Sequence, residues 1–372
     1  MIKFIKTVIN QGLLEKLVVA VFSAVMIFGL VKIVEAPFKE FVRYLQMENN
    51  EVDINASYLP AIEKKPVVFI FGGDVMLSRQ VNSRMVKYDD YGWPFLKIAD
   101  FLREADFTII NLESPFIKAS DYFVPTGSFM FKADPKATQG LLAAGIDLVS
   151  LANNHSLNQG RAGLKESFSI LKDNNIKYIG AGHNESEARA AEIIEINGER
   201  FAFLAYAYPN DNSVATEEQA GIATMDIAEM RADVEKLKAD GNIVIVNMHA
   251  GIEYVTEPNW QQVDFAHAAI EAGAEAVIGH HPHWPQTFEF YQGKPIIYSL
   301  GNLVFDQMWS LETRQGLLAK LNWQNGWKKI ELIPVKIYDY GQPEIISDEI
   351  ERVNILEKVG GDSSGIIWEK GR

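Results

Sequence analysis

Short apolar runs alternate with amphipathic stretches along most of the chain from Pro66 onward. The runs are rich in β-branched and aromatic residues, and stretches such as Ala162–Asn174 and Ile227–Ala239 have helical periodicity. This alternation is typical of an α/β fold with a parallel or mixed sheet that is buried on both faces. The predicted strands are Val67–Phe71, Phe107–Asn111, Asp147–Ala152, Lys177–Gly180, Phe201–Tyr208, Ile243–His249, Ala276–Gly279 and Ile296–Leu300.

The pattern changes toward the C-terminus. Gly316–Trp323 and Lys329–Ile337 flank an Asn-Gly pair at 325–326, which predicts an antiparallel hairpin that completes a sheet. We expect the folded domain to span residues 66–345. Residues 346–372 contain the segment GGDSSG and have no clear period, which predicts a loose tail.

The N-terminal residues have a different pattern. Leu17–Val31 carries no charge, and residues 32–34 extend the apolar stretch if the lysine snorkels. Because roughly 20 residues span a bilayer, we predict a single-pass anchor in the cell membrane within residues 1–35 and a juxtamembrane linker over residues 36–65. Three lysines precede the stretch, which places the C-terminal domain outside the cytoplasm. A cleaved signal peptide is the alternative, but no convincing cleavage site follows the stretch.

The amino-acid composition limits the metal ligands, nucleophiles and partners that the protein can have. The 372 residues include no cysteine, which excludes disulfides, thiolate metal ligands and a cysteine nucleophile. Any metal ion is therefore held by His, Asn, Asp or Glu. The formal net charge of −14 gives a nucleic acid no electrostatic reason to bind, so we expect no nucleic-acid partner.

Polar side chains follow five of the predicted strands, at the edge where open α/β sheets bind ligands. Taken singly, each has a structural alternative, such as a turn or cap residue, a solvated acid or a core histidine. Five of the seven histidines nevertheless lie in these segments, and a surface loop has no need for three imidazoles in four residues. The candidate residues are Asp74, Glu113, Asn153, Asn154, His155, His249, His280, His281 and His283.

Carboxylates, an amide and imidazoles form a ligand set that suits Mn, Fe or Zn better than Ca or Mg alone. Two such ions about 3.5–4 Å apart, bridged by a carboxylate, generate hydroxide near neutral pH and clamp a phosphoryl or acyl oxygen. The sequence therefore predicts a hydrolytic centre with one or two divalent ions.

Several motifs carry a resemblance to a known family. They occur in order from Phe69 to Asp306 and read GGDVMLSR, NLESP, SLANNHSLNQG, GAGHN, HAGIEY, GHHPHWPQ and YSLGNLVFD. The order Asp, Glu, Asn-His, His, His-x-His resembles the calcineurin-like metallophosphoesterases. The wording of the motifs resembles the CapA family, named for poly-γ-glutamate capsule biosynthesis. The resemblance implies a four-layer αββα sandwich, and the predicted anchor fits the family's membrane-attached members.

The resemblance also implies roles for the first metal position. Asp74 would bind the first ion, Glu113 would replace the bridging carboxylate, and His283 would complete this position. Met76 departs from the pattern, because ordinary phosphoesterases have a metal-binding histidine there. The missing histidine ligand would weaken the first metal position. The centre would then hold a single ion, or its first position would fill only when the substrate contributes an oxygen ligand.

The second position would be formed by Asn154, His249 and His281. His280 is an alternative to His281, because Gly-His-His-Pro-His permits two registers, although the His-x-His spacing favours His281. Asn158 and Ala250 depart from the family pattern, which usually has Asp and often Trp at these places.

The remaining candidates surround the ions. His155 would stand beside the substrate as an acid or electrophile and would share catalysis with Asp74. Arg79 could meet an anionic substrate, and a salt bridge is the alternative. The residues expected to support the ligands or face the substrate are Arg79, Asn153, Glu253, Tyr254, His280 and Asn302.

Three functions remain open at this point. The first is a membrane-anchored metal-dependent hydrolase or transferase that acts outside the cytoplasm on an anionic envelope polymer, which the family name implies is poly-γ-glutamate. The second is a non-catalytic polymer-binding or export subunit that docks to membrane subunits of a capsule synthesis complex. A phosphatase of the 5′-nucleotidase type would share the site but predicts a closed pocket.

Overall fold

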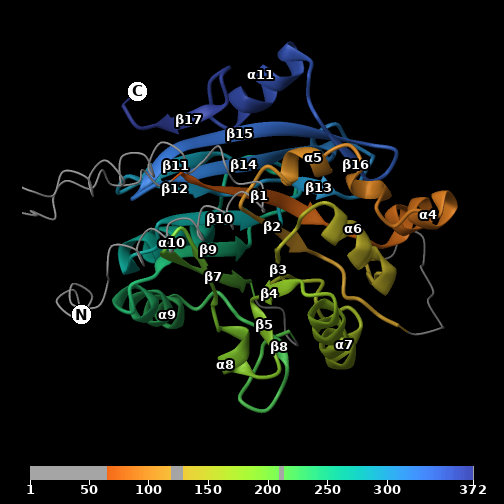
Figure 1. Cartoon of the computed structure of the whole chain (residues 1–372), viewed down its shortest axis with the longest axis horizontal. Coiled ribbons are helices and arrows are strands. Elements are labelled where there is room, and N and C mark those ends of the chain that lie inside the picture. Colours follow the sequence, from red (N-terminus) through yellow and green to blue (C-terminus); the bar gives the residue numbers. More distant parts are fainter. Residues whose placement is uncertain (1–64, 119–128, 209–212, 372) are drawn as a thin grey trace, which may run out of the picture. The chain divides into compact units, whose positions relative to one another are not determined.

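Figure 1 shows a computed structural model of the chain, which describes residues 65–118, 129–208 and 213–371. Contacts divide the chain into the units Met1–Glu63 and Lys64–Arg372. All described residues belong to the second unit, which has a mixed α/β fold with several sheets.

The larger sheet has nine strands in the order β16-β15-β14-β1-β2-β3-β4, with β13 paired to β1 and β17 paired to β15. Strands β1 to β4 are parallel, whereas β14, β15 and β16 continue the sheet as antiparallel neighbours. The strands are β1 (Val67–Val75), β2 (Phe107–Leu112), β3 (Leu148–Ser150), β4 (Lys177–Ile179), β13 (Asn302–Val304), β14 (Gln315–Trp323), β15 (Trp327–Tyr338), β16 (Gln342–Ile345) and β17 (Ile366–Glu369).

The smaller sheet has six strands in the order β11-β12-β10-β9-β7-β6. Its four central strands are parallel, and an antiparallel strand closes each edge. The strands are β6 (Glu192–Ile196), β7 (Glu199–Ala207), β9 (Ile243–His249), β10 (Ala276–His280), β11 (Phe288–Tyr291) and β12 (Lys294–Ile297), and a separate two-stranded ribbon pairs β5 (Ala181–Gly182) with β8 (Gly221–Ile222).

Aromatic side chains join the two large sheets. Phe69 of β1 contacts Phe201 of β7 with ring centroids 4.8 Å apart, and Phe107 of β2 stacks on Phe203 of β7 at 5.4 Å. All four rings lie within one buried apolar core. Because buried aromatic rings contribute much of the apolar area that a core removes from water, this contact fixes the two sheets face to face.

Helices cover the other face of the smaller sheet. Alternate residues of β9, such as Val244 and Val246, form a second core with Met230 and Phe265 from two helices. Figure 1 shows those helices, α9 and α10, beside β9 and β10. The helices are α4 (Arg79–Tyr88), α5 (Ala99–Leu102), α6 (Thr138–Ala143), α7 (Gly160–Asp173), α8 (Glu185–Ala188), α9 (Ile227–Ala239), α10 (Trp260–Ala272) and α11 (Glu349–Lys358), with 3-10 turns η2 (Trp93–Phe95), η3 (Pro135–Ala137) and η4 (Glu312–Arg314).

Each predicted strand overlaps an observed strand, and the predicted hairpin is confirmed as β14 and β15. The predicted loose tail over residues 346–372 is wrong. Ile355 and Leu356 of α11 are buried, and β17 pairs antiparallel with β15. Both elements are short, so neither has enough turns or alternations to produce a period in the sequence.

The predicted location at the cell membrane is corrected by the structure. Across residues 65–118, 129–208 and 213–371, none of the helices combines the length and the apolar character that crossing a bilayer demands. The apolar stretch at residues 17–34 and residues 36–64 of the predicted linker lie outside the described residues.

A glycine sets the geometry of β1 near its end. The amide of Asp74 donates to the Gly301 carbonyl at 2.9 Å, and a Cβ placed on Gly73 would lie 1.9 Å from the same oxygen. Any side chain at residue 73 therefore pushes apart the two segments that position Asp74.

We predict that Gly73→Ala lowers the free energy of unfolding by about 2 kcal/mol, the usual scale of forced overpacking. Thermal unfolding followed by circular dichroism measures the change. Gly361→Ala is the control, since its Cβ would lie 3.3 Å from the nearest atom and its φ is not positive. Equal unfolding temperatures for the two variants would contradict this account of Gly73.

Candidate metal centre

The polar residues that follow the strands meet where the carboxyl ends of the two sheets come together. Asp74 lies near the end of β1 and is the register partner of Asn111 in β2. His249 ends β9 and is the register partner of His280, which ends β10. Side chains from two sheets and four strands therefore share one buried site.

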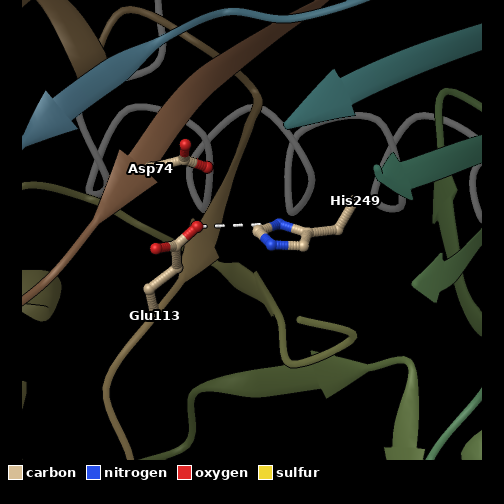
Figure 2. A group of neighbouring side chains, drawn as sticks. All are labelled: Asp74, Glu113 and His249. Atoms are coloured by element: carbon tan, nitrogen blue, oxygen red, sulfur yellow. Dashed lines mark ion pairs between the residues drawn. The ribbon is translucent and has the colours of Figure 1, made fainter. Parts of the chain in front are cut away.

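Asp74, Glu113 and His249 form the centre of this site. Each offers one ligand atom, and these atoms lie within 4.8 Å of one another. Figure 2 shows the two carboxylates side by side, with the imidazole facing them from the other sheet. His249 Nδ1 lies 3.6 Å from Glu113 Oε1, and all three side chains are buried. Two oxygens and one imidazole nitrogen are suitable ligands for a divalent transition metal.

Three further predicted ligands surround this centre. Asn154 Oδ1 lies 3.0 Å from His249 Nε2, and the ring of His281 lies 4.8 Å from the ring of His249. His283 Nδ1 lies 3.3 Å from Asp74 Oδ2. The structure thus brings together all six residues that the resemblance implies as ligands; their individual roles stay predictions.

Several polar atoms in the site have no hydrogen-bond partner among the described residues. They are Glu113 Oε2, His281 Nδ1 and both ring nitrogens of His280. His280 is 1% exposed and its Nδ1 lies 3.7 Å from Asp74 Oδ1. Buried polar atoms without a partner cost free energy, and a bound cation would satisfy such acceptors. The donor set and these atoms together fit a divalent ion.

Burial sets the protonation of the ligands. It lowers the pKa of His249 well below the usual value, and it lowers the pKa of His280 to about 4, so both imidazoles are neutral near pH 7. Burial and the neighbouring Asp74 charge raise the pKa of Glu113 well above its usual range. For Asp74, burial acts in the same direction, but the interactions with His283, His249 and His280 together outweigh it and the pKa is lowered. Neutral imidazole is the form that binds metal ions.

His155 lies beside the cluster, on the loop after β3. Its Nδ1 lies 3.0 Å from Asn158 Oδ1, which also accepts a hydrogen bond from the Phe131 amide. An amide oxygen accepts only, so Nδ1 of His155 carries the proton and Nε2 has the free electron pair. Burial lowers the pKa of His155 to about 4. The ring is therefore neutral near pH 7, and the role of His155 as an acid or electrophile stays a prediction.

The histidine loop, residues 281–283 after β10, has a strained backbone and is held by contacts with neighbouring side chains. His281 and His283 have positive φ values of 101° and 59°, which non-glycine residues adopt rarely. His283 Nδ1 lies 2.9 Å from Asn302 Oδ1, and the Tyr254 ring stacks on His283. Glu253 is half-buried and its charge acts on Glu113. Asn302, Tyr254 and Glu253 thus lie where the sequence expects supporting residues.

Arg79 has a structural partner. Its guanidinium forms an ion pair with Asp306, and both side chains are at most 10% exposed. Asp306 Oδ2 also accepts from the Gln80 amide at 3.0 Å. The arrangement matches the salt bridge, the alternative that the sequence left open.

The sequence did not identify Asn111 as a site residue, although its side chain contacts Asp74, Glu113 and His249. Its Nδ2 lies 2.8 Å from Asp74 Oδ1 and 2.9 Å from Glu113 Oε1. The predicted support residue Asn153 donates to Asn111 Oδ1 at 3.2 Å. The NLESP motif places Asn111 at the end of a strand, which is the same signal that identified the other candidates. In this motif, however, the predicted ligand is Glu113, two residues later.

Comparison with known proteins decides the family. The family described as "Bacterial capsule synthesis protein PGA_cap" matches residues 68–307, more than half of the chain and all of the cluster. This chain belongs to the PGA_cap family. The match agrees with the CapA resemblance of the motifs.

Two curated relatives agree with the family. The chain is 29% identical over 317 residues to "Capsule biosynthesis protein CapA" of Bacillus anthracis, covering 83% of this chain and 76% of the relative. It is 27% identical over 302 residues to "PGA biosynthesis protein CapA" of Bacillus subtilis (strain 168), covering 80% and 79%. A solved structure of a hypothetical protein from Thermus thermophilus aligns with 16% identity and a TM-score of 0.48, covering 73% of this chain and 100% of that one.

We predict that His249→Ala weakens binding of Mn²⁺ or Zn²⁺ by at least about tenfold, because it removes one of the three converging ligands. Isothermal titration calorimetry on the full chain measures the affinity. His267→Ala is the matched control, because His267 pairs with Glu289 and stacks on Tyr291 outside the cluster. Equal affinities in the two variants would exclude His249 as a ligand.

Proposed function

We propose that this protein takes part in the biosynthesis of capsular poly-γ-glutamate, as a divalent-metal hydrolase or transferase that acts on the polymer or its precursor. The observation that carries the catalytic part is the convergence of Asp74, Glu113 and His249 within 4.8 Å in a buried site. We infer the identity of the polymer from the names of the family and of the two Bacillus relatives. The two face-to-face sheets, with helices outside the smaller one, support the metallophosphoesterase-type αββα sandwich.

A divalent ion bound here would supply Lewis acidity and a water of lowered pKa. The chain itself supplies a neutral base beside that position. His155 is held by Asn158 at Nδ1, and its ring packs against Phe131 with centroids 4.1 Å apart. These contacts fix the ring and its tautomer, so that Nε2 is the atom that accepts a proton.

An anionic polymer is the partner that this proposal requires. The chain carries a net charge of −14, which repels polyanions over most of a surface. Attraction therefore has to come from the centre itself, where a divalent ion is the largest local charge. The proposal places recognition at one acidic unit of the polymer rather than along an extended basic groove.

We predict that the full chain, supplied with Mn²⁺ or Zn²⁺, cleaves a phosphodiester such as bis-p-nitrophenyl phosphate or a γ-glutamyl peptide. His155→Ala should lower kcat by at least about 10²-fold, the usual contribution of a positioned general base. Release of p-nitrophenol, or of amine from the peptide, measures turnover.

His183→Ala is the control for a histidine outside the cluster, since His183 is exposed and packs edge-on against Phe168. Its turnover should equal that of the unaltered protein. Bound metal without turnover on either substrate would contradict catalysis and favour a non-catalytic polymer-binding or export subunit.

A further inference from the structure

Asn111 has an unusual number of acceptors around one nitrogen. Its Nδ2 lies 2.8 Å from Asp74 Oδ1, 2.9 Å from Glu113 Oε1 and 3.2 Å from His249 Nδ1. An amide nitrogen has two hydrogens, so it cannot donate fully to three acceptors. These acceptors belong to the same three side chains that converge as potential metal ligands.

The polarity of the surrounding hydrogen bonds fixes which end of the amide faces the cluster. The His155 backbone N–H donates to Asn153 Oδ1 at 3.1 Å. The Asn153 amide nitrogen must therefore point the other way, where it donates to Leu112 O at 2.8 Å and Asn111 Oδ1 at 3.2 Å. Asn111 consequently presents its N–H groups to the carboxylates.

A flipped Asn111 would oppose this chain of bonds. Its Nδ2 would face the Asn153 nitrogen, placing two donors against each other, and its oxygen would face two carboxylate oxygens. Both contacts are unfavourable because Asp74, Asn111, Glu113 and Asn153 are all buried. The amide oxygen of Asn111 is thus not available as an ion ligand in this arrangement.

We propose that the Asn111 amide occupies the position between Asp74, Glu113 and His249 that a divalent ion takes, so that an ion binds there by displacing it. This inference rests on the metal centre of the proposed function. In the absence of an ion, the N–H groups hold the two acids together. When an ion enters, Asn111 has to leave its hydrogen bonds, which lowers the affinity of the centre.

The inference predicts a change opposite to that of structural damage. Asn111→Ala removes the competing amide, so Mn²⁺ binding should tighten by about tenfold. Asn111→Asp should tighten it at least as much, because it exchanges a donor for a carboxylate ligand. Without metal, Asn111→Asp adds a third buried acid and should unfold at a lower temperature than the unaltered protein. Added Mn²⁺ should reverse that loss.

Titration calorimetry with Mn²⁺ on the full chain, together with thermal unfolding with and without Mn²⁺, measures both effects. Asn247→Ala is the matched control. Asn247 is equally buried and lies two residues from His249, but its amide donates to Leu204 O at 3.1 Å. Its affinity for Mn²⁺ should equal that of the unaltered protein.

The outcomes separate this inference from the function on which it rests. Tighter binding in Asn111→Ala, with Asn247→Ala unchanged, supports it. Unchanged or weaker binding in Asn111→Ala overturns it, while the metal centre stands if the unaltered protein binds Mn²⁺. Absence of Mn²⁺ binding in the unaltered protein and in both Asn111 variants would overturn the metal centre and the inference together.

Discussion

The burial of two carboxylates side by side is the constraint on which the site depends. Asp74 and Glu113 are almost completely inaccessible to solvent, and like charges in such a place are unfavourable unless other groups compensate. The raised pKa of Glu113 expresses that cost. Neutral imidazoles and the N–H groups of Asn111 surround the pair, and a bound cation would compensate both acids at once. A buried site of this kind could hold a divalent ion.

The fold supplies this arrangement by bringing the carboxyl ends of two sheets together. Phenylalanines of both sheets fix their faces, while the contact of Gly73 with Gly301 allows β1 to place Asp74 beside the histidine loop. That loop holds His281 and His283 in left-handed backbone conformations. Such strain persists where surrounding contacts determine the conformation, here the hydrogen bond of Asn302 and the ring of Tyr254.

Much of this architecture was predictable from the sequence, because strand periodicity and strand-end polar residues are local signals. The strands that carry Asp74 and His249 and the hairpin around Asn325 follow from such patterns. The role of Asn111 did not, since it depends on the direction of hydrogen bonds that run through Asn153 from another loop. Elements α11 and β17 also escaped prediction, because long-range packing rather than periodicity stabilises them.

The central claim is that Asp74, Glu113 and His249 bind a divalent ion in a position that Asn111 otherwise fills. The most direct test is an anomalous difference map from crystals soaked in Mn²⁺, collected on both sides of the manganese absorption edge. The account predicts a peak between these three side chains, with the Asn111 amide rotated out of its present hydrogen bonds. A map without a peak there, or a peak beside an Asn111 that keeps all of its contacts, would contradict it.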